Sequence, residues 1–209
     1  MRAVVQRVLS ASVEVSALLN SLHGRNLLGI LVETSPECFF CSGRSQVEGR
    51  LVSAIGPGLL VLVGVHKADT DSDADYICRK VLNMRLFPNE KTGKAWDQSV
   101  MQRNLEVLLV SQFTLYGILK GNKPDFHVAM TPAKAKPFYA SLVEKFQRSY
   151  AADSVKDGVF GAMMKVSLVN DGPVTMQVDS PSQQGAAESS NGNDGLLRDG
   201  EARVPKETC

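Results

Sequence analysis

The sequence has few of the residues that mark a secreted, membrane-spanning or metal-binding protein. Its four cysteines are too few and too scattered for a disulfide scaffold. Its apolar runs are far shorter than a membrane span, and the opening MRAVVQRV has no uninterrupted apolar core of a signal peptide. The one CxxC pair, Cys38 and Cys41, has no second pair or histidine partner, so we expect no metal site. These absences favour a soluble protein of the cytoplasm.

Common hydrolase motifs are also absent. There is no GxSxG elbow, HExxH helix or P-loop. Of the three histidines, His127 offers the alternative of a Ser-His-Asp esterase, although a lone histidine is more often structural. The net charge of +1 predicts that any RNA partner is held through few phosphates.

The apolar pattern predicts a mixed α/β protein. Hydrophobic residues make up 44% of the chain, enough for a buried core. The continuous apolar run at 59–65 predicts a strand covered on both faces. Further β-branched or apolar runs predict strands at 3–8, 11–15, 51–55, 107–110, 162–169 and 174–178.

Two helices are predicted. The acidic stretch 69–75 precedes an apolar pattern and suits the positive end of a helix dipole. A second helix begins at Thr131 as N-cap, with Pro132 in its first turn. Its apolar residues fall on one helical face. Many strands with only two helices predict a layered α/β sandwich.

The chain is expected to form one domain over 1–179, interrupted at 16–47 and followed by a disordered tail at 180–209. The tail has no aromatic residue and few apolar ones. Joining Val15 directly to Glu48 gives a compact hairpin with Glu48-Gly49 at its turn. We therefore interpret 16–47 as an insertion whose deletion preserves the fold.

Two short motifs are candidates for the site. The first, SQFT, comprises Ser111 to Thr114 and ends a buried strand, where rigid folds display binding groups. The alternative is that its hydroxyls simply satisfy neighbouring backbone groups, and the pattern alone favours that interpretation. The second is Gly172-Pro173 within NDGPVT, where a cis bond is energetically accessible but an ordinary hairpin turn fits as well.

Five segments together resemble the D-aminoacyl-tRNA deacylase family. They are MRAVVQRV, SQFTL, KGNKPDFH, KDGVFGAMM and NDGPVT. The resemblance covers residues 1–15 and about 48–179, in the order of the family. It implies a three-layer β/β/α sandwich with two main helices, and a homodimer whose active site lies at the subunit interface.

The resemblance also implies roles for single residues. The catalytic pocket is lined by Ser111, Gln112, Phe113 and Thr114. Substrate-binding residues are Gly172 and Pro173, a cis pair that reaches into the pocket of the partner subunit; Arg7, which holds this pair; and Phe160, which packs the terminal adenine. An older alternative makes Thr114 a covalent nucleophile, but no base is visible beside it in the sequence.

The implied function is hydrolysis of the ester that joins a D-amino acid to the 3′ end of tRNA, while L-aminoacyl-tRNA is rejected. Glycyl-tRNA is an expected second substrate. The 2′-hydroxyl of the tRNA assists, and no metal or organic cofactor is expected. The alternative from another class is a non-catalytic protein that associates with nucleic acid on the same fold.

Overall fold

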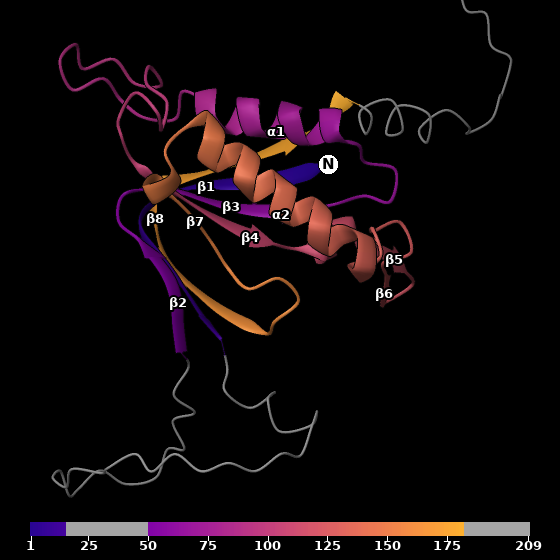
Figure 1. Cartoon of the computed structure of the whole chain (residues 1–209). Helices are drawn as coiled ribbons and strands as arrows, with labels where there is room; N and C mark the ends of the chain where they lie inside the picture. Colours follow the sequence, from indigo (N-terminus) through magenta and orange to yellow (C-terminus); the bar gives the residue numbers. More distant parts are fainter. Residues whose placement is uncertain (16–49, 182–209) are drawn as a thin grey trace, which may run out of the picture.

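The computed structural model describes residues 1–15 and 50–181 (Figure 1). The expected insertion at 16–47 lies outside the described residues, as does the tail apart from its first two residues. The flanks of the insertion pair as the sequence predicts. Val15 lies opposite Arg50, and Ala11 lies opposite Ile55, in an antiparallel ladder.

One six-stranded mixed sheet forms the centre of the molecule. Its order is β2-β1-β3-β4-β7, and β8 also pairs with β1. The pairs β3–β4 and β4–β7 are parallel, whereas β1 is antiparallel to β2, β3 and β8. The strands are β1 (Arg2–Val15), β2 (Arg50–Ile55), β3 (Gly58–Gly64), β4 (Glu106–Ser111), β7 (Val155–Asp157) and β8 (Met164–Asp179). A separate hairpin contains β5 (Ile118–Lys120) and β6 (Lys123–Asp125).

Both predicted helices are confirmed. Helices α1 (Asp71–Asn83) and α2 (Pro132–Ser149) lie together over one face of the sheet (Figure 1). At the start of α1, the Asp73 carboxylate accepts a hydrogen bond of 2.9 Å from the backbone N–H of Thr70. Thr131 is the N-cap of α2, although its side chain makes no capping hydrogen bond. The buried side chains of α2 are those on the predicted face: Ala135, Tyr139, Leu142, Val143 and Phe146.

The central strands bury side chains on both faces, as the apolar run at 59–65 predicts. Leu59 and Val61 belong to the core beneath the helices. Leu60 points to the opposite face and joins a second core with Val8 and Val13 of β1. The outer half of β1 therefore packs back over the sheet. Helices, central strands and this second β layer stack in the β/β/α order that the resemblance implies.

Two pairs of predicted strands are single strands in the structure. Residues 3–8 and 11–15 belong to one strand, β1, and most of 162–169 joins 174–178 in β8. The two long strands pair along their lengths, and the ladder shifts register between Arg7 and Ser10. The residues that separated the predicted strands, 9–10 and 170–173, lie at these shifts of register, and the ladder continues on either side.

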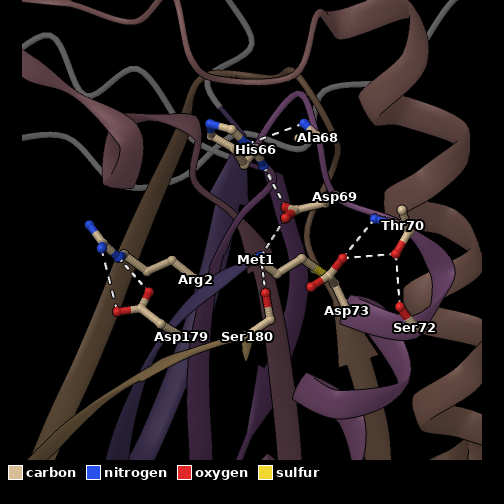
Figure 2. Close-up of polar contacts among 10 residues, drawn as sticks. All are labelled: Met1, Arg2, His66, Ala68, Asp69, Thr70, Ser72, Asp73, Asp179 and Ser180. Carbon is tan, nitrogen blue, oxygen red and sulfur yellow. Dashed lines mark hydrogen bonds and ion pairs between the residues drawn. The ribbon is translucent and has the colours of Figure 1, made fainter. Parts of the chain in front are cut away.

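Buried polar contacts fix the start of β1 (Figure 2). The amino group of Met1 lies 2.5 Å from Asp69 Oδ1 and donates to Ser180 Oγ at 2.6 Å. The other carboxylate oxygen of Asp69 accepts from the backbone N–H of His66 at 2.6 Å. Burial raises the pKa of Asp69, and the hydrogen bond from the Met1 amino group opposes this rise. The network joins β1 to the segment before α1 and to the end of β8.

Candidate functional site

The SQFT motif lies where β4 ends. Ser111 is the last residue of β4, and a 3₁₀ helix (Phe113–Tyr116) follows at once. The backbone N–H of Gln112 donates to Val63 O at 2.7 Å, which ties the motif to the neighbouring strand. Gly64 stands against this turn, because a Cβ placed there would lie 3.2 Å from Gln112 O. The predicted position of the motif at a strand end is confirmed.

The hydroxyl of Thr114 faces Gln112 and not a base. The side-chain amide of Gln112 donates a short hydrogen bond to Thr114 Oγ1. Within residues 1–15 and 50–181, no histidine or carboxylate hydrogen-bonds this hydroxyl. A hydroxyl with no adjacent base is a weak nucleophile at neutral pH. The arrangement is therefore better suited to positioning a substrate than to attacking it.

The motif includes an exposed aromatic side chain that contacts a second aromatic ring. Phe113 is 59% exposed, and its ring meets that of Phe126 edge to face at 5.0 Å between centroids. Phe126 also packs against Gly117, where a Cβ would come within 2.9 Å of its ring. Phe126 was not predicted as a neighbour of Phe113, because the β5–β6 hairpin separates the two residues in sequence.

His127 does not form a catalytic triad in the described part of the chain. Its Nδ1 lies 2.8 Å from Asp125 Oδ2, and no serine hydroxyl in that part of the chain contacts the ring. Asp125 is also paired with Lys120. The hydrogen bond from Lys120 is the main reason that the pKa of Asp125 falls to about 2. Lys120, Asp125 and His127 therefore form a charge cluster beside the site.

The second motif is held by Arg7. Gly172-Pro173 is a cis peptide, as the resemblance implies, and Gly172 has a φ of 112°. Arg7 Nε lies 2.8 Å from Asp171 Oδ2, and Nη1 of Arg7 donates to Leu86 O at 2.6 Å. A Cβ on Gly172 would lie 2.8 Å from a methyl group of Val174 and 3.1 Å from Arg7 Nη2. Only glycine fits between them.

Two aromatic rings complete the surroundings of Arg7. Its guanidinium lies 6.0 Å from the ring centre of Phe87 and 5.9 Å from that of Trp96. Such cation–π contacts limit the motion of a side chain that is already only 15% exposed. Trp96, which is 56% exposed, was not predicted from the sequence. The feature of the sequence that could have indicated its role is that it is the single tryptophan and lies in a polar segment.

Phe160 follows the end of β7 and lies against Tyr139 of helix α2. Its ring is 5.8 Å from that of Tyr139, and it packs against the core under α1 and α2. Burial raises the pKa of Tyr139, and the nearby Asp157 raises it further. Phe160 is partly exposed, and its contact with adenine stays a prediction.

The two motifs lie toward opposite ends of strand β3 in one chain. Ser111 pairs with Val63, which in turn pairs with Ala3 of β1. Gly172-Pro173 falls between the partners of Arg7 and Val8. Four residues separate Ala3 from Arg7, or roughly 13 Å of strand. A single chain therefore does not place Gly172-Pro173 against Ser111–Thr114.

The described residues contain neither a metal-binding cluster nor a membrane-spanning helix. In 1–15 and 50–181, no group of three or more His, Cys, Asp or Glu side chains is arranged to hold a metal ion. Cys38 and Cys41 lie outside this range. No helix among the described residues is long and apolar enough to span a membrane.

Comparison with known proteins gives consistent matches. The family model described as D-Tyr-tRNA(Tyr) deacylase matches residues 41–179. The D-aminoacyl-tRNA deacylase of Dictyostelium discoideum is 53% identical over 139 residues, which span 66% of this chain and 92% of that protein. The Drosophila melanogaster protein of the same name is 52% identical over 68% of this chain and 89% of its own length. Human D-aminoacyl-tRNA deacylase 1 is 49% identical over 65% of this chain and 64% of its own length.

Two solved structures share the fold. One, named c-Myc DNA unwinding element binding protein, has a TM-score of 0.69 and 42% identity, covering 87% of this chain and 99% of its own. The other, a probable eukaryotic D-amino acid tRNA deacylase, has a TM-score of 0.61 and 15% identity over 85% of this chain and 98% of its own. The mixed sheet with two helices on one face thus defines a known class of α/β fold. Within that class, the chain belongs to the D-aminoacyl-tRNA deacylase family of tRNA-editing hydrolases.

Proposed function

We propose that this chain hydrolyses the ester bond of D-aminoacyl-tRNA and spares L-aminoacyl-tRNA, acting as a homodimer in the cytoplasm. The observation that carries the proposal is the combination of SQFT at the end of β4 with a Gly172-Pro173 pair held by Arg7. The family membership of the chain supports the same activity.

Positioning would supply most of the acceleration. An aminoacyl ester is already activated, so oriented groups and donors aimed at the developing oxyanion are sufficient chemistry. The side-chain amide of Gln112, the Ser111 hydroxyl and the first backbone N–H groups of the 3₁₀ helix provide such donors. The first N–H groups of a helix have no partner within it. In this account the 2′-hydroxyl of the tRNA assists the attack, and Thr114 forms no covalent intermediate.

Selection between enantiomers would rest on exclusion. Gly172 and Pro173, fixed by the Arg7–Asp171 ion pair, would bound the pocket on the side where an L side chain has to point. A D side chain would point away from this wall, so many D-amino acids would be accepted. Glycine has no side chain to exclude, which makes glycyl-tRNA a second expected substrate.

The separation of the two motifs supports a homodimer. Because Gly172-Pro173 lies roughly 13 Å along the sheet from SQFT in its own chain, the wall would come from the partner subunit. Exposed apolar side chains close to Gly172 in the ladder suit such an interface, namely Leu9, Leu168 and Val169. Phe160 would contact the terminal adenine of the 3′ end.

A second candidate function is association with DNA, without catalysis, on the same fold. The solved structure with 42% identity is named as a DNA-unwinding-element binding protein, and this name favours DNA binding as the second candidate function. Release of tyrosine from D-Tyr-tRNA and from L-Tyr-tRNA separates the two. The proposed enzyme releases D-tyrosine selectively, a binding protein releases neither, and an unselective esterase releases both.

A further inference from the structure

Positive charge is concentrated in the segment that follows the SQFT motif. From Ser111 to Lys136 the chain carries four lysines and one carboxylate, whereas the whole chain has a net charge of +1. This segment contains the 3₁₀ helix, the β5–β6 hairpin and the first turns of α2. The charge therefore lies next to the candidate site and not at random over the surface.

The fold brings one more lysine to the same place. The backbone N–H of Lys67 donates to Val128 O at 2.9 Å, and that of Met130 donates to Val65 O at 2.9 Å. These bonds hold the end of β3 against the loop that leads into α2. The β5–β6 hairpin lies beside the start of α2 (Figure 1). We call the exposed side chains Lys67, Lys123, Lys134 and Lys136 the lysine surface.

The charge of the lysine surface is not neutralised by its neighbours. Within the described residues, no carboxylate forms an ion pair with any of its four members. The carboxylate in the segment, Asp125, is already paired with Lys120 and His127. The first turn of α2 holds no acidic residue, so the positive end of its dipole adds to the same field.

We propose that the lysine surface binds the phosphate backbone of the acceptor end of tRNA, guiding the 3′ ester to Ser111–Thr114. The inference rests on the proposed function. It adds contacts with the substrate beyond the terminal nucleotide. Lysine ammonium groups serve as point charges for phosphates. The exposed Phe113, which contacts Phe126, offers a ring for a base to stack on.

The experiment compares two substrates and two charge-matched variants. The substrates are D-tyrosyl-tRNA and the D-tyrosyl ester of the trinucleotide CCA, which lacks the acceptor stem. The test variant is K123E with K136E. The control is K80E with K91E, which makes the same change of charge at exposed positions on α1 and in the loop after it.

The test variant is expected to lose about tenfold or more in kcat/KM on D-tyrosyl-tRNA and less than about twofold on the CCA ester. For this variant, the slope of log kcat/KM against the logarithm of the salt concentration should become shallower by about 0.7 to 0.9 for each phosphate contact removed. The control should match wild type on both substrates. Equal losses on both substrates, equal losses in the control, or unchanged activity on tRNA would each overturn the proposal. The last result would point to an acidic protein as the occupant of this surface.

Failure of the proposed enzymatic activity is distinguishable from failure of the lysine surface to bind tRNA. If wild type hydrolyses neither substrate, binding of uncharged tRNA, measured by fluorescence anisotropy, still tests the surface. The test variant should then bind about tenfold more weakly than the control. Equal Kd values would contradict the inference.

Discussion

Arg7 and Asp171 form an ion pair across the ladder between β1 and β8, with 2.8 Å between Nε and Oδ2. Asp171 directly precedes Gly172, so the pair fixes the backbone that enters the Gly172-Pro173 segment. Leu86 O and the rings of Phe87 and Trp96 restrain the same guanidinium. The wall of the proposed pocket thus depends on residues from three separate parts of the chain.

Replacing Gly172 with alanine should damage the wall. The added Cβ would collide with Val174 at 2.8 Å and press on Arg7 at 3.1 Å, at a φ of 112° that disfavours a side chain. We expect kcat/KM on D-tyrosyl-tRNA to fall on the order of 10- to 100-fold. Gly93→Ala is the control, because Gly93 also has positive φ but nothing within 4 Å of its Cβ. It should cost about 1 kcal/mol of stability and leave kcat/KM unchanged. Equal activity of the two variants would refute the role of Gly172.

Thr114→Ala should remain active. The Thr114 hydroxyl accepts a hydrogen bond from Gln112 and contacts no base in the described residues. We therefore expect kcat/KM within about threefold of wild type, whereas Thr114→Trp should crowd the proposed site and abolish turnover. Complete loss in a folded Thr114→Ala protein, or an acyl-enzyme detected by mass spectrometry, would establish the covalent alternative.

Mixing two impaired variants should restore activity above that of either alone if the wall comes from the partner subunit. After random exchange of Gly172→Ala with Thr114→Trp subunits, half of the dimers are mixed and each mixed dimer has one intact site. About a quarter of wild-type activity should return. Native mass spectrometry would confirm the exchange. Proven exchange without recovery would mean that each site is built from one chain.

Asp69→Ala should destabilise the fold. Asp69 pairs with the buried amino group of Met1 at 2.5 Å and accepts from His66 N–H, so its loss leaves both donors without this carboxylate. We expect a loss of about 3 to 5 kcal/mol and a Tm lower by roughly 10 °C. Asp71→Ala, at an exposed position in the first turn of α1, should cost less than about 1 kcal/mol. Similar melting curves for the two variants would contradict the structural role of Asp69.

Local patterns predicted the elements of this fold better than their connections. Thr131, Pro132 and the apolar face of α2 are signals contained within a few turns of chain, and the helix formed as predicted. The breaks predicted within β1 and β8 were wrong. There, pairing with a distant strand carries the chain through residues such as Asn170 that locally favour a turn.

The site was predictable in its motifs but not in its supports. The end of β4 at Ser111 follows from the apolar run before it. The partners of Arg7 lie about 80 to 165 residues away in sequence, and only the register of β1 with β8 brings Asp171 beside it. The lysine surface likewise depends on the hydrogen bond from Lys67 N–H to Val128 O, which no spacing in the sequence reveals.

The central claim is tested most directly by the ratio of kcat/KM on D-Tyr-tRNA to that on L-Tyr-tRNA, measured with the same tRNA and enzyme preparation. Steric exclusion by the Gly172-Pro173 wall predicts a ratio of at least about 100 in favour of the D-ester. Equal rates on the two enantiomers, or no release from either, would contradict the account.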